Sequence, residues 1–73
     1  MAKLEAKAEV TGSVWKIVTT VGQKLAAGDV VMILESMKME IPVIVEDPGT
    51  LTEFRVAEGE AITEGQVVAI LEG

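Results

Sequence analysis

The sequence of 73 residues contains no cysteine, histidine or tyrosine, and Trp15 and Phe54 are its only aromatic residues. Without cysteine or histidine the chain has no thiol nucleophile, no imidazole base, no disulfide bond and no ordinary zinc or iron–sulfur site. The usual hydrolytic and redox enzymes are therefore disfavoured, and we expect no metal ion. The core must be aliphatic, which at this length leaves a small margin of stability.

Basic residues are also scarce, because six Lys and Arg stand against twelve Asp and Glu, giving a net charge of −6. Nucleic acids and anionic membrane surfaces bind clustered positive charge, so neither is an expected partner. The longest apolar run, Val30 to Leu34, is far shorter than the ~20 residues of a membrane-spanning helix. Charged residues alternate from Lys3 to Glu9, which is unlike a secretory signal. We therefore expect a soluble cytoplasmic protein.

An internal repeat is the most informative feature of the sequence. A shift of 37 residues aligns the chain with itself, without a gap, at three pairs of glycines and one pair of apolar segments. The pairs are Gly12 with Gly49, Gly22 with Gly59, Gly28 with Gly65, and 30–35 with 67–72. The sequence therefore predicts one domain, residues 1–73, made of two copies of the same half.

Glycines that flank short β-branched runs are typical of turns between strands. Residues 3–10 alternate charged and apolar side chains, as a half-buried strand does. Residues 32–40 are rich in helix-forming types, but Pro42 and the repeat favour two strands joined by a tight turn at 36–38. We predict no helix, and strands at 3–10, 14–20, 30–35, 39–45, 51–56 and 67–72, with brief extended segments at Leu25 and Ile62.

Neither half can bury its apolar face alone, so we predict an all-β protein whose halves pack face to face about a pseudo-twofold axis. The turn at 36–38 then lies as far from the chain ends as this fold allows. Trp15 is expected to cover one face of the sandwich. The predicted core residues are Val14, Ile17, Leu25, Val30, Ile33, Leu51, Phe54, Ile62, Val67 and Ile70.

The segment Glu35-Ser36-Met37-Lys38-Met39-Glu40 has unusual character for a hairpin. A two-residue turn favours Asn-Gly because both central residues need positive φ, and Met37-Lys38 suits that geometry poorly. A free lysine amine is no ready nucleophile, so Lys38 is a better acceptor of modification than a catalyst. Met37 and Met39 can adapt to the surface of a partner, and Glu35 and Glu40 can hydrogen-bond one.

Two other interpretations of this segment follow from the residues alone. On spacing, an ordinary solvated lysine at a turn is as good an explanation as a modified one. A catalytic dyad of Ser36 and Lys38, or an acid–base pair of Glu35 and Glu40, is disfavoured, because a turn offers no pocket that excludes water.

The motif within its repeat resembles the biotinyl, or biotin carboxyl carrier, domain of biotin-dependent carboxylases, whose attachment motif is Met-Lys-Met preceded by Ala or Ser. The resemblance covers nearly the whole chain, including the glycines on both sides of the motif. It implies a flattened barrel, or barrel-sandwich hybrid, with biotin joined by an amide bond to Lys38. In that family biotin carries carboxylate from a biotin carboxylase to a carboxyltransferase, and the domain itself catalyses nothing.

The resemblance also implies a biotin protein ligase that recognises the folded tip. Met37 and Met39 would help to place the lysine, and the ligase would also recognise Glu35, Ser36 and Glu40. The chain departs from many members of the family by having Val10-Thr11 rather than a proline-containing stretch before the first glycine.

The ungapped repeat leaves no room for the protruding thumb of some bacterial carriers. The chain is therefore similar to stand-alone biotin/lipoyl attachment proteins, and a lipoyl carrier of a dehydrogenase complex is one alternative. Lipoyl domains more typically carry Asp-Lys-Ala at the tip, so Met37 and Met39 favour biotin. An unmodified interaction module with an acidic surface is another alternative. The domain itself is expected to be a monomer.

Overall fold

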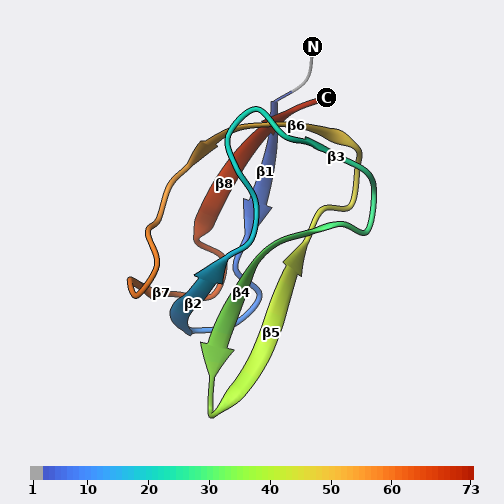
Figure 1. The fold of residues 1–73 in the computed structure, drawn as a ribbon. Coiled ribbons are helices and arrows are strands. Elements are labelled where there is room, and N and C mark those ends of the chain that lie inside the picture. The colour runs from blue at the N-terminus through green and yellow to red at the C-terminus, as the bar shows by residue number, and fades with distance from the viewer. Residues whose placement is uncertain (1–2) are drawn as a thin grey trace.

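A computed structural model of the chain describes residues 3–73, and within that range it contains eight strands and no helix (Figure 1). The predicted all-β class is therefore confirmed. No helix in the described range could cross a lipid bilayer. The strands are β1 (Lys3–Lys7), β2 (Gly12–Ile17), β3 (Lys24–Leu25), β4 (Val30–Ser36), β5 (Met39–Ile44), β6 (Gly49–Phe54), β7 (Ala61–Ile62) and β8 (Val67–Glu72).

The predicted strands are all present, but several of their ends differ from the prediction. The strand expected at 3–10 ends at Lys7, because Ala8 instead hydrogen-bonds to the turn that contains Gly65 and Gln66. β2 and β6 begin at Gly12 and Gly49, two residues earlier than predicted, and end earlier as well. These two glycines were expected in turns and instead lie within strands. The expected role in turns holds for the four glycines with positive φ, namely Gly22, Gly28, Gly59 and Gly65.

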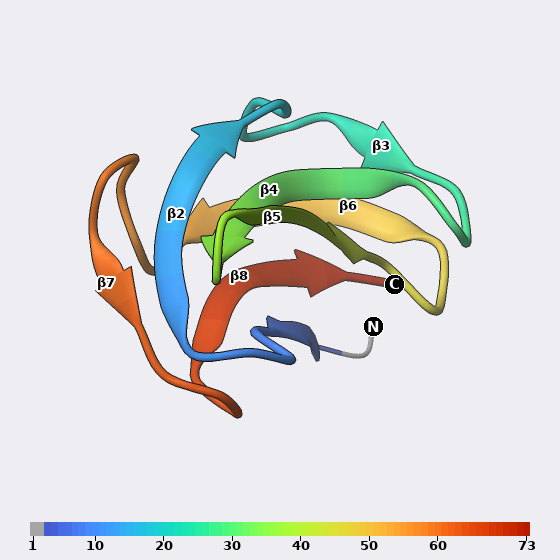
Figure 2. The same cartoon turned by 90° about the horizontal axis from the view of Figure 1, so that it is seen from below.

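The strands form two antiparallel four-stranded sheets, with the orders β1-β8-β6-β3 and β5-β4-β2-β7. Seen along the long axis, the strands curve around a common centre (Figure 2). Each sheet takes two strands from residues 1–37 and two from residues 38–73. The prediction that the halves simply pack face to face is wrong in this respect. The halves interlock, because β3 pairs with β6 and β7 pairs with β2.

The 37-residue repeat relates the two sheets strand by strand, with β1 to β4 corresponding to β5 to β8. The irregularities repeat as well. Trp15 on β2 and Thr52 on β6 are extra residues in β-bulges, and so are Val31 on β4 and Val68 on β8. Bulges bend and twist the strands that contain them, which helps the two sheets to curve around one core.

The core contains only apolar side chains, and the described residues include no buried polar or charged side chain. Four of the predicted core residues, Val14, Leu25, Leu51 and Ile62, are buried in it. Two more, Ile17 and Phe54, are partly buried against it. The other buried members of this core are Ala6, Ala8, Val31, Met32, Leu34, Val43, Val45, Val56, Val68, Ala69 and Leu71.

The core prediction is wrong for three residues, Val30, Ile33 and Val67, none of which is buried. Val30 is exposed and Ile33 and Val67 are half-buried, whereas Ile70 is buried as predicted. The bulges at positions 31 and 68 shift the alternation of β4 and β8, so the neighbouring apolar residues point inward instead.

The molecule is elongated, with extents of 36 × 17 × 17 Å. The turn between β4 and β5 lies at one end of the long axis (Figure 1). The start of β1 and the C-terminus lie at the opposite end. The predicted position of the turn, far from the chain ends, is therefore confirmed.

Candidate functional site

The β4–β5 hairpin places Lys38 at the end of the molecule. Ser36 pairs with Met39, which makes Met37 and Lys38 the two central residues of the turn. Their φ angles are 53° and 63°, and within residues 3–73 they are the only non-glycine residues with positive φ. Such conformations cost about 1–3 kcal/mol per residue. The chain therefore accepts strain at a position where Asn-Gly would avoid it.

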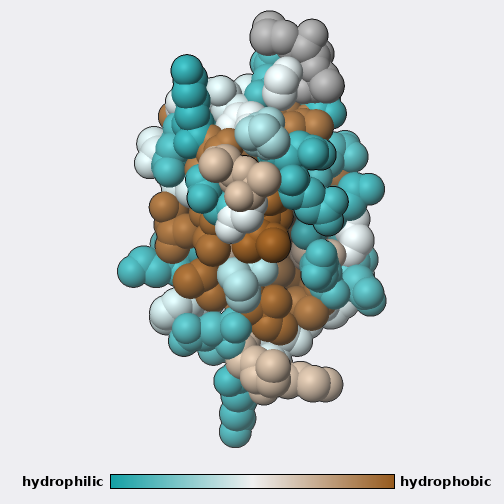
Figure 3. Space-filling view, turned by 90° about the vertical axis from the view of Figure 1, so that its right-hand side faces the viewer, coloured by the Kyte–Doolittle hydropathy of each residue, from teal (hydrophilic) through white to brown (hydrophobic). Residues whose placement is uncertain are grey.

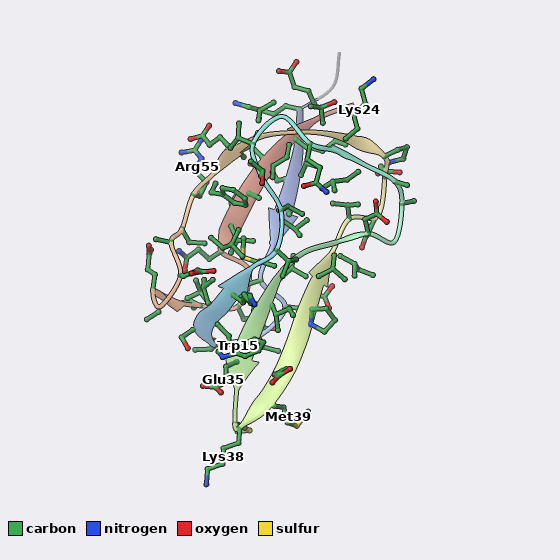
Figure 4. The ribbon with its side chains drawn as sticks, viewed as in Figure 1. Trp15, Lys24, Glu35, Lys38, Met39 and Arg55 are labelled. Carbon is green, nitrogen blue, oxygen red and sulfur yellow. The ribbon has the colours of Figure 1, made fainter. Side chains whose placement is uncertain are left out.

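The side chains at the tip are freely accessible. Met37 is 93% exposed and Met39 is 61% exposed. Lys38 points away from the body along the long axis (Figure 4), and neither of the two ion pairs within residues 3–73 includes it. An accessible amine without an ionic partner, held at an apex, suits the covalent attachment of a group that must enter another protein.

Residues 11–13 hold the base of this hairpin. The Ser36 hydroxyl donates a 2.9 Å hydrogen bond to the carbonyl oxygen of Thr11. The Thr11 hydroxyl in turn accepts a 3.0 Å bond from the Glu64 amide. Ser13 pairs with Glu35 across β2 and β4. The tip therefore projects from β4, which is held in place by residues 11–13. Those residues are in turn bonded to Glu64 in the second half of the chain.

Gly12 is required because β4 passes directly over it. A Cβ atom at Gly12 would collide with the carbonyl oxygen of Glu35, one residue before Ser36. At the equivalent Gly49 a Cβ would lie 2.9 Å from the carbonyl oxygen of Glu72, which is also too close. This contact joins residues far apart in the chain and has no signal in the local sequence. The match of Gly12 with Gly49 signalled its importance but not its cause.

Glu35 and Glu40 lie directly opposite each other on β4 and β5, and both are exposed. Like charges at opposed positions destabilise a strand pair. Neither glutamate takes part in the two ion pairs formed within residues 3–73. A cationic group from a partner would relieve this repulsion at the base of the tip.

The structure brings all six residues of the predicted site to one end of the molecule. A groove of about 360 Å³ lies elsewhere, between the edge strands β1 and β5, and none of the residues 35–40 lines it. The described residues 3–73 also contain no group of three or more His, Cys, Asp or Glu side chains that could hold a metal ion. The predicted site residues therefore lie together at the exposed end of the β4–β5 hairpin.

Comparison with known proteins identifies the family. A family model described as "Biotin-requiring enzyme" matches residues 5–72. The chain belongs to this family. A biotinylated protein TB7.3 homolog of Mycobacterium leprae is 37% identical over 67 residues, covering 92% of this chain and 94% of the relative. A biotin/lipoyl attachment protein of Bacillus subtilis is 38% identical over 60 residues, covering 82% of each protein.

Two solved carboxylase structures share this fold. The urea carboxylase of Kluyveromyces lactis superposes with a TM-score of 0.91 at 32% identity, covering 97% of this chain and 6% of the carboxylase. A single-chain, multi-domain long-chain acyl-CoA carboxylase gives a TM-score of 0.88 at 21% identity, covering 96% of this chain and 7% of that one. The chain thus spans a small part of each carboxylase, and the predicted biotinyl fold is confirmed.

Proposed function

We propose that this protein is a biotin carboxyl carrier and that Lys38 is its attachment point. The observation that carries the proposal is the position of Lys38, which is exposed and strained at the apex of a two-residue turn in a chain of the biotin-requiring family. The names of its relatives, a biotinylated protein and a biotin attachment protein, support the same conclusion.

Attachment joins Nζ of Lys38 to the carboxyl carbon of biotin in an amide bond. A free carboxylate does not react with an amine, so a biotin protein ligase activates it with ATP. The bond to the activating group breaks as the amide forms, and the ammonium group of Lys38 loses two protons. Because the tip provides no closed pocket, we assign the base that accepts these protons to the ligase.

The residues around Lys38 have supporting roles in this proposal. Met37 and Met39 offer flexible apolar contacts on both sides of the amine, and both are largely exposed. The hydrogen bond from Ser36 to Thr11 fixes the strand from which the tip projects. The opposed pair of Glu35 and Glu40 attracts a cationic group of the ligase.

Biotin supplies a ureido nitrogen that carries carboxylate from a biotin carboxylase, which consumes ATP and bicarbonate, to a carboxyltransferase. The chain itself contributes a rigid 36 Å body and an apex from which the arm reaches both sites. The names of its relatives include a biotin-dependent acyl-CoA carboxylase subunit and a urea carboxylase, which supports carboxylases as the partners. In this proposal the carrier is a cytoplasmic monomer, and its partners perform the catalysis.

The test is incubation with biotin, ATP and a biotin protein ligase, followed by intact mass measurement and peptide mapping. The wild type and Lys24→Arg, a control at another exposed lysine, are expected to gain one biotin on the peptide containing Lys38. Lys38→Arg keeps the positive charge and is expected to gain none. A parallel reaction with a lipoate ligase addresses the alternative raised by the biotin/lipoyl relative. Strong lipoylation without biotinylation would overturn the proposal.

A further inference from the structure

The outer face of the sheet that bears the tip is apolar. We call this surface the tip-side face, and it consists of Trp15, Val30, Ile33, Pro42 and Ile44. Val30 pairs with Ile44, and Ile33 pairs with Pro42, across β4 and β5. Trp15 is 47% exposed and Ile44 is 50% exposed. Figure 3, which looks at the side where β5 lies, shows hydrophobic side chains across the middle of the molecule above the tip.

Trp15, which the sequence predicts to cover one face of the sandwich, is about half exposed on β2. It is the bulge residue of β2, beside Lys16, whose partner on β4 is Ile33. In Figure 4 it lies near Glu35, at the end of the sheet closest to the tip. Partly exposed tryptophans are among the residues that contribute most to the stability of protein interfaces.

The internal repeat supplies a comparison within the same chain. At three of the five equivalent positions, which lie 37 residues away, the second sheet carries polar or charged residues, while Val67 and Ile70 match Val30 and Ile33. Thr52 stands in the place of Trp15, Glu5 in that of Pro42, and Lys7 in that of Ile44.

Two exposed loop positions that follow β2 differ in the same way. Val18 and Val21 are exposed, whereas Arg55 and Glu58 occupy the equivalent positions in the second half. The same fold therefore tolerates polar residues at three positions of this face, so Trp15, Pro42 and Ile44 need not be apolar for the chain to fold.

The difference between the two sheets is clearest at Ile70, which is covered by its neighbours. Ile70 is the equivalent of Ile33 and is only 2% exposed. It pairs with Glu5 and Glu53, and Arg55 forms a 3.3 Å ion pair with Glu53. Long charged side chains thus cover the second sheet, while the tip-side face has no comparable cover and remains available to a partner.

We propose that the tip-side face is the docking surface for the biotin carboxylase, an inference that rests on the proposed function of Lys38. The face is continuous with the tip, because β5 runs from Met39 to Ile44, a distance of about 17 Å. A protein seated on it lies beside the hairpin rather than beyond its apex. The bare amine of Lys38 points away from this position, whereas an arm lengthened by biotin can fold back to it.

The chemistry of the face defines the complementary surface. The carboxylase should present an apolar area with a recess for Trp15. A second copy of the chain is a poorer occupant, because each copy carries a net charge of −6 and the two would repel each other. The ligase is also a poorer occupant, because it must enclose the apex to reach the amine.

The test variant transfers the outer surface of the second sheet to the first. Trp15→Thr, Pro42→Glu and Ile44→Lys together install the residues that the chain itself carries at equivalent positions. One added acidic and one added basic residue leave the net charge at −6. The control variant, Glu5→Ala with Lys7→Ala, changes the other sheet and also leaves the net charge unchanged. The single variants Trp15→Thr and Ile44→Lys replace the triple variant if it fails to fold.

Each protein is first biotinylated and checked by intact mass, and the biotinylation rate is recorded over a range of carrier concentrations. It is then incubated with a purified biotin carboxylase, ATP and radiolabelled bicarbonate, with free biotin as a reference substrate. The wild type and the control are expected to be carboxylated at much lower concentrations than free biotin. For the triple variant, which we call the face variant, we expect the KM of the carboxylase for the carrier to rise about tenfold or more. Its kcat and the kinetics of biotinylation should be unchanged.

Several results would overturn the docking inference. One is an unchanged KM in the face variant, and another is a wild-type carrier that is no better a substrate than free biotin. A third is an equal loss of biotinylation rate in the face variant, which would assign the face to the ligase. Sedimentation that shows a wild-type dimer abolished in the face variant would assign it to a second copy. Failure of the wild type to accept biotin would instead refute the proposed function, and the mass measurement reveals that before any carboxylase is added.

Discussion

The conformation of the turn connects the chemistry of single residues to function. Met37 and Lys38 both have positive φ, which side chains with a Cβ atom adopt at a cost. Asn-Gly adopts the same turn without that cost. The pair is therefore better suited to recognition by a partner than to folding, which is the interpretation that the sequence favoured.

Replacing the turn should separate stability from function. Met37→Asn with Lys38→Gly is expected to raise the free energy of unfolding by about 1–3 kcal/mol, because it relieves the backbone strain. The control Lys38→Ala keeps a Cβ atom at the strained position, so its stability should stay close to that of the wild type. Both variants should lose biotinylation. Urea denaturation and intact mass measure the two effects, and equal stability of both variants would show that the turn is not strained.

At the scale of elements, the close contact between β2 and β4 determines where the tip lies. The contact depends on the absence of a side chain at Gly12, where β4 passes over the backbone. In the second half, Gly49 and β8 make the equivalent contact, and a Cβ atom at Gly49 would have more room than one at Gly12. The two glycines therefore form a matched pair, one next to the tip and one at the opposite end of the molecule.

Gly12→Ala is expected to lower the free energy of unfolding by about 1–3 kcal/mol, because the Glu35 carbonyl must move away from the new methyl group. Gly49→Ala should cost less. Only the change at Gly12 should also slow biotinylation, since it displaces the strand that carries Lys38. Thermal unfolding and initial rates with the ligase measure these effects. Equal losses of modification in both variants would mean that β4 does not position the tip.

At the scale of the whole molecule, the two repeats share one core. Each sheet contains strands from both halves, so neither half can complete a sheet alone. The prediction that residues 1–73 form one domain is a statement about cooperative folding, which remains to be tested.

We expect peptides 1–37 and 38–73 to be unfolded separately, because each would expose the apolar residues that the other half covers. The intact chain should unfold in a single transition that is the same by circular dichroism and by tryptophan fluorescence. Circular dichroism of the peptides provides the direct comparison. A strand-rich spectrum from either peptide alone would contradict the interlocked architecture.

Some features of the fold are written in the local sequence and others are not. The repeat located every strand, because its glycines and β-branched runs recur at the same spacing. The repeat and Pro42 also located the turn at 36–38, and the poor fit of Met37-Lys38 to a turn indicated a role other than folding. The analysis failed to divide 30–35 and 67–72 into inner and outer residues. A continuous apolar run has no alternation, and the bulges at Val31 and Val68 shift the register.

The amino-acid sequence by itself determined an all-β protein with a largely aliphatic core, a duplicated plan and one accessible lysine between the copies. These properties follow from local preferences and spacing, which the order of residues contains. Only the tertiary structure decided which apolar residues point inward, how the halves interlock and why Gly12 lacks a side chain. Those features depend on contacts between strands far apart in the chain, where a bulge or a close approach changes which face a residue occupies.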